Sequence, residues 1–242
     1  MKITALYSGF FLLSLLFMGC EKETFHIVPS DQISTRSHDI TSFNELYISD
    51  PFQVYVQFSD TEQELKIEAN DNLHQIIEIE QVDGRLSIKL EDNINLGDNT
   101  PVLKVFLTAS AFQRIKAQGA TQVYLQNQWF GDQTEIILSG ASYLEGTVTA
   151  EQLTAKINGA STLALRGSAT LSETELEGTS EMTGLEFATS KLKANLSGGC
   201  NLTLTVHEEL HITASGGSKV QYQGEGIVTY QKLSDSSEII KL

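Results

Sequence analysis

Cysteine is scarce in this chain, which has Cys20 and Cys200 as its two cysteines in 242 residues. A lipid on Cys20, for which the motif is given below, would leave one thiol, and one thiol cannot form an internal disulfide. The fold must then be stabilised by packing alone. The length is enough for one large all-β domain or two small ones, with a sizeable core in either case.

Basic residues are also few, with 16 Lys and Arg against 31 Asp and Glu, a formal net charge of −15. This deficit argues against nucleic acid as a partner, because binding to phosphates needs a basic surface. It argues equally against electrostatic adhesion to anionic lipid. The acidic residues are spread along the chain, which is typical of a solvated surface and not of a dedicated calcium cluster.

Signatures of catalysis are missing as well. The sequence has no Gly-rich phosphate loop, no nucleophile elbow and no Cys/His pair, and no segment has a convincing amphipathic helical pattern. We therefore expect an all-β protein that is not an enzyme and needs no cofactor.

The first 19 residues differ from the rest and predict a signal peptide. Lys2 is their one charge, and the apolar run from Phe10 to Met18 is too short to span a bilayer comfortably. Leu-Leu-Phe-Met-Gly directly before Cys20 resembles a lipobox, which predicts a lipid anchor on Cys20 in the outer membrane; an ordinary cleaved signal is the alternative. Glu21-Lys22-Glu23 resembles short tags that direct some lipoproteins to the cell surface, and a periplasmic orientation stays open.

Strand patterns begin after a polar tether predicted over residues 20–40, and we assign residues 41–115 to an N-terminal β region. Apolar residues alternate with polar ones over 52–58, 65–69 and 86–90, as expected for strands with one buried face. Asp83-Gly84 predicts a hairpin turn.

An internal repeat fills residues 116–242. Glycine followed by two small residues recurs at intervals of 21, 19, 19, 20 and 18, and a degenerate Asp235-Ser236-Ser237 follows 19 residues later. An apolar residue stands four positions after and two positions before the first residue of every one of these tripeptides. The glycines are Gly119, Gly140, Gly159, Gly178, Gly198 and Gly216.

This period is the length of one coil of a β-solenoid, in which successive coils hydrogen-bond about 4.8 Å apart. Glycine would turn each corner, where a Cβ would clash or φ must be positive. Cys200 stands in a slot filled elsewhere by Ser or Thr, so we expect a small buried side chain and no nucleophile. The predicted fold is an N-terminal β-layer continuing into a single-chain, parallel β-helix-like solenoid with coils of about 19–20 residues.

The order of these motifs resembles the GIN-domain family, the head of auto-transporter adhesins common in Bacteroidetes lipoproteins. The resemblance covers about residues 40–235, through segments such as Leu-Lys-Ile-Glu-Ala-Asn-Asp-Asn-Leu at 65–73 and Ile-Lys-Ala-Gln-Gly-Ala at 115–120. It implies one continuous all-β domain at the cell envelope. It supplies no catalytic residue.

Two motifs could carry chemistry. His207-Glu208-Glu209-Leu210-His211 matches the zinc-protease pattern, which requires a helix, but its flanks predict strands and so no metal site. Glu173, Glu175 and Glu177 alternate on the outer face of one coil, where some pectin-degrading β-helix enzymes hold acids and calcium; a charged face that discourages association is the preferred interpretation. Asp92–Asp98 only superficially resembles a calcium loop and predicts a turn.

Trp129 and Phe130 lie in the insertion that lengthens the first interval to 21 residues. They could form an exposed aromatic platform for a sugar or a partner, or pack a loop onto the core.

The leading hypothesis is a non-catalytic envelope lipoprotein, an adhesion or scaffold module that binds a protein or a glycan. The alternatives are a polysaccharide-active β-helix enzyme and a periplasmic structural or signalling accessory protein.

Overall fold

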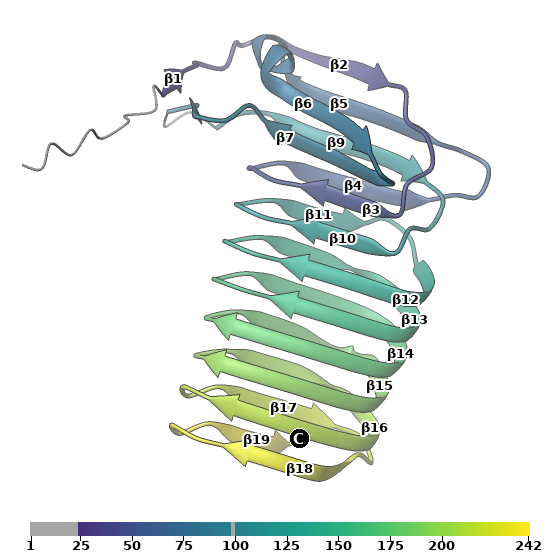
Figure 1. Cartoon of the computed structure of the whole chain (residues 1–242), viewed down its shortest axis with the longest axis vertical. Coiled ribbons are helices and arrows are strands. Elements are labelled where there is room, and N and C mark those ends of the chain that lie inside the picture. Colours follow the sequence, from purple (N-terminus) through teal and green to yellow (C-terminus); the bar gives the residue numbers. More distant parts are fainter. Residues whose placement is uncertain (1–23, 98–99) are drawn as a thin grey trace, which may run out of the picture.

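The computed structural model describes residues 24–97 and 100–242, and it is an elongated β-solenoid closed at its N-terminal end by a cap (Figure 1). Each coil contributes one strand to a front sheet and one to a back sheet, and the stack turns as a right-handed coil in the view of Figure 1. The predicted fold class is therefore confirmed. The 3₁₀ helix η1 (Asp71–Ile76) is the one helix in the described part of the chain.

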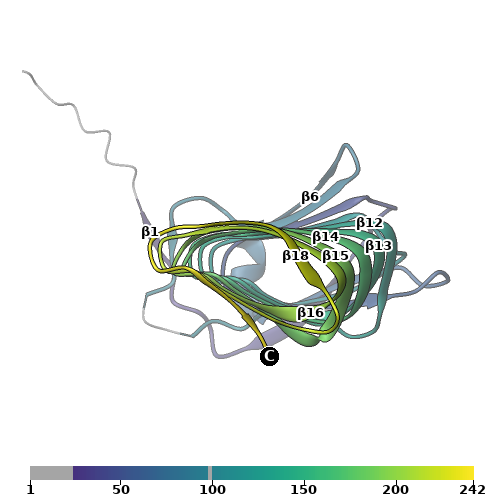
Figure 2. The same ribbon diagram turned by 90° about the horizontal axis from the view of Figure 1, so that it is seen from below.

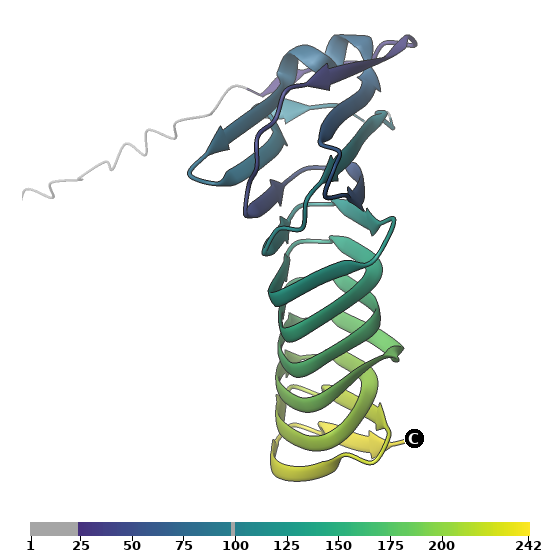
Figure 3. The same cartoon turned by 90° about the vertical axis from the view of Figure 1, so that its right-hand side faces the viewer.

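The front sheet holds the strands that precede each glycine corner, and the back sheet holds those that follow it. Strands β13 to β16 run through the opposite bend without a break, so each belongs to both sheets (Figure 3). The solenoid strands are β3 (Glu45–Ile48), β4 (Gln53–Phe58), β10 (Arg114–Ala117), β11 (Gln122–Leu125), β12 (Trp129–Leu138), β13 (Tyr143–Ile157), β14 (Thr162–Gly178), β15 (Glu181–Gly198), β16 (Asn201–Ser215), β17 (Lys219–Gln223), β18 (Ile227–Leu233) and β19 (Glu238–Lys241).

The cap continues both sheets upward and then reverses their direction. β7 pairs in parallel with β3 and β9 with β4, whereas β6 is antiparallel to β7 and β5 to β9. The Asp83-Gly84 turn joins β6 to β7 as predicted, with φ of 51° and 77° as a tight hairpin turn requires. The cap strands are β1 (Phe25–His26), β2 (Ile33–His38), β5 (Glu64–Asn70), β6 (Ile77–Val82), β7 (Arg85–Leu90), β8 (Ile94–Asn95) and β9 (Leu103–Ala109).

Two strands lie where the sequence predicted a tether. β2 pairs antiparallel with β5, and β1 pairs with β8, so the described part of residues 20–40 belongs to the cap. The polar composition of β2 misled the sequence interpretation, because an edge strand in a cap can be polar and still complete a sheet. Cys20 and the predicted signal peptide lie outside the described residues.

The repeat positions two before and four after each glycine form the core. Val123, Leu144, Leu163, Met182, Leu202 and Val220 are aligned by the strand register, and all have 0% exposure. The last coil departs from the pattern, since Leu233 is 37% exposed where its equivalents are buried. Asp235 and Ser236 turn this corner with positive φ in place of glycine.

Successive glycine corners are joined by backbone hydrogen bonds, in which the residue after one glycine donates to the carbonyl of the glycine one coil earlier. The backbone amide of Ala160 donates to the Gly140 carbonyl at 2.8 Å, and the same bond recurs from Ala141 to Gly119 and from Thr179 to Gly159. A Cβ on Gly159 would lie 2.5 Å from the Gly140 oxygen, and its φ is +79°. Both reasons that the sequence offered for glycine therefore hold at the same positions.

A small hydroxyl or thiol closes five of the six glycine corners from inside. Ser142 Oγ donates to the Ser139 carbonyl at 2.9 Å, and Ser180 and Ser218 repeat this bond three residues back. Cys200 has 0% exposure and its Sγ donates to the Ser197 carbonyl at 3.3 Å. The predicted small buried side chain is therefore confirmed, and burial raises the pKa of the Cys200 thiol.

Replacing Gly159 by Ala should lower the free energy of unfolding by about 2–4 kcal/mol, because the new methyl group meets a carbonyl oxygen in a strained backbone conformation. Thermal unfolding measures the effect. Gly199→Ala is the matched control, since a Cβ there meets nothing within 4 Å and should change stability little. Equal losses in the two variants would contradict the corner argument.

Candidate ligand-binding site

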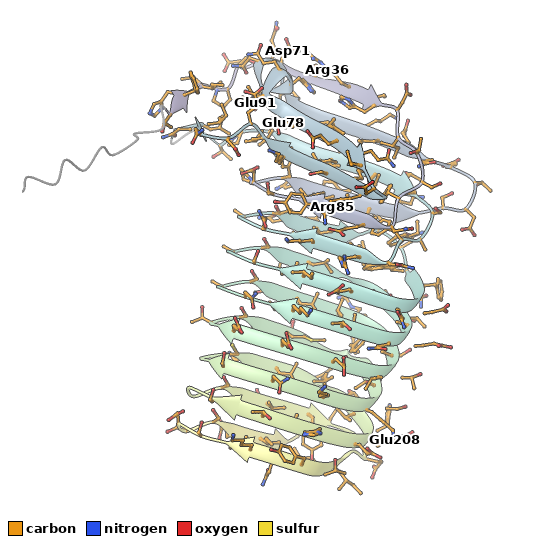
Figure 4. All side chains as sticks on the ribbon, viewed as in Figure 1. Arg36, Asp71, Glu78, Arg85, Glu91 and Glu208 are labelled. Carbon is orange, nitrogen blue, oxygen red and sulfur yellow. The ribbon has the colours of Figure 1, made fainter. Side chains whose placement is uncertain are left out.

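Outward side chains form columns along the stack, because the strands are parallel, in register and of period two. One column on the front sheet alternates in charge where the cap meets the solenoid, through Arg85 of β7, Glu45 of β3, Arg114 of β10 and Glu135 of β12. Glu45 Oε1 accepts from Arg85 Nε at 2.8 Å and its Oε2 from Arg114 Nη1 at 2.9 Å, and Arg114 Nε donates to Glu135. We call these four residues the ion ladder; Figure 4 labels Arg85 within it.

Glu45 is the buried member of the ion ladder, with a side chain only 12% exposed. Burial by itself would raise the pKa of Glu45. Hydrogen bonds from Arg85 and Arg114, together with their charges, outweigh that effect and hold the pKa below its usual value. Glu45 is thus kept ionised and its oxygens are occupied.

An open cavity of about 550 Å³ lies beside the ion ladder on the front sheet, and we call it the front groove. The β6–β7 hairpin, which projects beyond the outline of the coils in Figure 2, overhangs it and contributes Asp83 and Gly84. The other lining residues are Asn44, Glu45, Gln113, Arg114, Gln133, Thr134, Glu135, Gln152, Thr154 and Lys156.

Three glutamines give the front groove free hydrogen-bonding groups. Gln133 and Gln152 lie side by side in register on the adjacent strands β12 and β13, and Gln113 stands just before β10. Within the described residues the structure records no hydrogen bond from these three side-chain amides, whereas the neighbouring charges pair with one another. An amide both donates and accepts, so this row suits a ligand rich in hydroxyl groups.

A second cavity, of about 650 Å³, lies on the glycine-corner side of the ion ladder. Lys116 Nζ lies 5.4 Å from the centre of the Tyr47 ring and has no acidic partner among the described residues. Lys89 in the same cavity pairs with Glu78 at 2.6 Å. The second cavity thus continues the front groove across the front sheet, on the other side of the ion ladder.

The back sheet carries an aromatic column that the sequence interpretation missed. The Tyr55 ring lies 5.2 Å from Phe106 and 5.4 Å from Tyr124, nearly parallel to both, and Tyr143 follows at 6.0 Å. In the sequence, these aromatic residues alternate with apolar ones in separate segments. The column can be predicted from that pattern only when the strand register is known. Stacked rings cover one another's faces, so the middle rings offer only their edges to a sugar. Burial and a hydrogen bond to Glu145 raise the pKa of Tyr143 to about 12.

The predicted aromatic pair is divided by the fold. Trp129 has 0% exposure, packs on Phe58 and Phe112, and donates its indole N–H to the Phe112 carbonyl at 2.9 Å. Trp129 thus packs the insertion onto the core. The alternative prediction, an exposed platform of two aromatic rings, is wrong for Trp129. Phe130 remains 61% exposed at the bend.

The zinc-protease-like motif lies in the extended strand β16. Leu210 is buried and His207, Glu208, Glu209 and His211 are exposed, with Glu208 projecting at the bend in Figure 4. The strand assignment is thus confirmed. Among residues 24–97 and 100–242, no group of three His, Cys, Asp or Glu side chains could hold a metal ion.

The acidic triplet faces outward on β14 as the sequence predicted. Its charges are partly offset by neighbouring coils, because Lys193 of β15 pairs with Glu173 at 3.3 Å and Lys156 of β13 is in register with Glu175. The Asp92–Asp98 segment contains a turn at Asp92-Asn93 and then β8, so its described part serves to pair with β1.

A family described as "Putative auto-transporter adhesin, head GIN domain" matches residues 42–226. The chain belongs to this family. The resemblance inferred from the motifs is therefore confirmed, and the family's description concerns adhesion and not catalysis. In the described residues no helix is long and apolar enough to cross a membrane.

Solved structures share the fold of this GIN-domain protein. One from Bacteroides fragilis, described as a putative adhesin, has a TM-score of 0.75 at 20% identity, with 89% of this chain and 99% of that chain covered. A putative adhesin from Parabacteroides distasonis has a TM-score of 0.74 at 15% identity, with 90% and 100% covered. A protein of that species described as a putative lipid binding protein gives 0.73 at 16% identity, with the same coverage. No curated protein matches the sequence.

Replacing Glu45 by Gln should cost about 1–2 kcal/mol at neutral pH, because two charge-assisted hydrogen bonds to arginines are lost. The lowered pKa means that the carboxylate stabilises the fold above its unfolded value of 4.5 and that this contribution fades as pH falls through the folded pKa. The gap in unfolding free energy between the two proteins should therefore narrow below pH 4.5.

Glu186→Gln is the control, since its side chain is 75% exposed and its ion pair with Arg166 lies at the surface. It should be near neutral at every pH. A pH-independent gap for Glu45→Gln would contradict the proposed ionisation.

Proposed function

We propose that this protein is a non-catalytic lipoprotein of the cell envelope, anchored through Cys20, whose front groove binds a glycan. The observation that carries the proposal is the row of unpaired amides at Gln113, Gln133 and Gln152 beside a self-neutralised ion ladder. The membership of an adhesin-like family supports a binding role at the envelope or cell surface.

A glycan fits the front groove better than a protein does. Protein interfaces centre on apolar or aromatic anchors in dry pockets, and the lining of the front groove holds no large apolar side chain. Amides, hydroxyls and charged groups on a rigid sheet match the hydroxyl-rich edge of a sugar chain. The second cavity adds the Tyr47 ring and Lys116 for a ring face or an acidic substituent.

The rival function is a polysaccharide-active enzyme using carboxylates of the same groove. Glycoside hydrolysis needs one carboxyl group protonated near neutral pH and a second one ionised. Glu45 has its pKa shifted in the opposite direction, and Glu135 is engaged by Arg114 and Lys156. The test is to incubate the protein with a panel of glycans and measure new reducing ends. Hydrolysis that is lost in Glu45→Gln or Glu135→Gln would contradict the non-catalytic proposal.

The double variant Gln133→Ala/Gln152→Ala should weaken glycan binding at least tenfold while leaving the melting temperature unchanged, because it removes exposed hydrogen-bonding groups that the fold does not use. A glycan array followed by calorimetry measures the affinity. Gln57→Ala/Gln126→Ala on the back sheet is the matched control and should bind as the wild type does. Unchanged binding by the front-sheet variant, with loss in the control, would overturn the choice of face.

Replacing Cys20 by Ala, in a chain whose residues 1–19 are exchanged for an ordinarily cleaved signal peptide, should move the mature protein from the membrane fraction to the soluble fraction, because the chain's acidity gives it no electrostatic attraction to lipid. Mass spectrometry of the N-terminal peptide reports the acyl groups in the wild type. Membrane retention of the variant would contradict the anchor. Protease treatment of intact cells separates surface display from a periplasmic accessory role.

A further inference from the structure

The N-terminal segment of the cap exposes apolar side chains. Phe25, Val28 and Ile33 have 59%, 70% and 53% of their surface exposed, and all three lie within nine residues. Ile27, between the first two, turns inward and packs against the core. Exposed apolar groups clustered in this way mark an interaction site more often than single ones do.

Backbone hydrogen bonds fix this segment to the cap. The Phe25 amide donates to the Asn93 carbonyl at 2.9 Å and the Ile27 amide to Asn95 at 3.0 Å. The Asn72 side chain donates to the Val28 carbonyl and accepts from the Ser30 amide, both at 2.8 Å. These bonds fix the backbone of residues 25–30 on the cap, and β1 lies on the glycine-corner side of the stack (Figure 1).

Phe25 lies a short distance along the chain from Cys20. Four residues separate Cys20 from Phe25, so even a fully extended chain places the two α-carbons no more than about 18 Å apart. A lipid on Cys20 would thus hold β1 within about 18 Å of the point where the anchor enters the bilayer. Residues 24–35 contain no Lys or Arg, so contact of this segment with lipid must come from apolar burial and not from charge.

We infer that Phe25 and Val28 insert into the interface of the neutral phospholipid bilayer that holds the anchor, so that the cap rests on the membrane in a fixed orientation. This inference rests on the proposed lipidation of Cys20. Two side chains are too few to hold the protein without the anchor, so they orient a molecule that is already tethered.

The test uses the acylated full-length mature protein in vesicles of neutral phospholipid, with and without brominated acyl chains. Val28→Cys carries an environment-sensitive dye, and Ile227→Cys, at an exposed apolar position of the last coil, is the matched control. Cys200 is buried and stays unlabelled. We expect a blue shift and at least twofold bromine quenching at position 28, and neither at position 227.

Equal signals at the two positions would overturn the inference. So would a blue shift at position 28 that rises with protein concentration and comes without bromine quenching, because it would indicate that a second copy of the chain covers the patch. Amide hydrogen–deuterium exchange tests the same contact without a dye. Binding to vesicles should slow exchange at residues 25–30, and the double variant Phe25→Ser/Val28→Ser should abolish that slowing. An acylated Cys20 without quenching overturns only the docking, whereas an unacylated Cys20 overturns the anchor as well.

Discussion

The stacking of one glycine carbonyl on the next glycine corner is the contact on which the rest of the solenoid depends. The carbonyl of Gly140 occupies the space where a Cβ of Gly159 would lie, and it accepts the amide of Ala160. At Gly159 the positive φ and the close approach of this carbonyl together exclude a residue with a Cβ. Once the corners are aligned, the strands between them fall into register, and every second side chain is placed in a column either inside or outside.

The function proposed for the front sheet follows from these outer columns. In-register stacking places Arg85, Glu45, Arg114 and Glu135 in contact although they come from distant parts of the chain. Their charges neutralise one another and leave the adjacent glutamine amides as the free hydrogen-bonding groups of the front groove. On the back sheet the same stacking places tyrosines face to face, which hides the ring faces that a sugar would use. Identical geometry thus yields the proposed binding surface on one sheet and a self-packed surface on the other.

Much of the solenoid could be predicted because its information is local and repeated. The spacing of Gly119, Gly140 and their successors gives the coil length, and the apolar offsets give the inward columns. The cap could not be predicted in this way, because β2 is polar and finds its partner β5 only through a long-range antiparallel pairing. The front groove was missed for a similar reason: no local pattern links Glu45 to Arg114. Trp129 was left undecided by sequence, and only the packing against Phe58 and Phe112 assigns it to the core.

The ligand is proposed to bind across the front sheet at the junction of cap and solenoid. Hydrogen–deuterium exchange with and without a bound glycan tests it most directly, because it maps the contact surface without any substitution. Protection should appear at β3, β10 and the front half of β12, together with the β6–β7 hairpin. Protection confined to β4, β11 and the aromatic column of the back sheet would contradict the account.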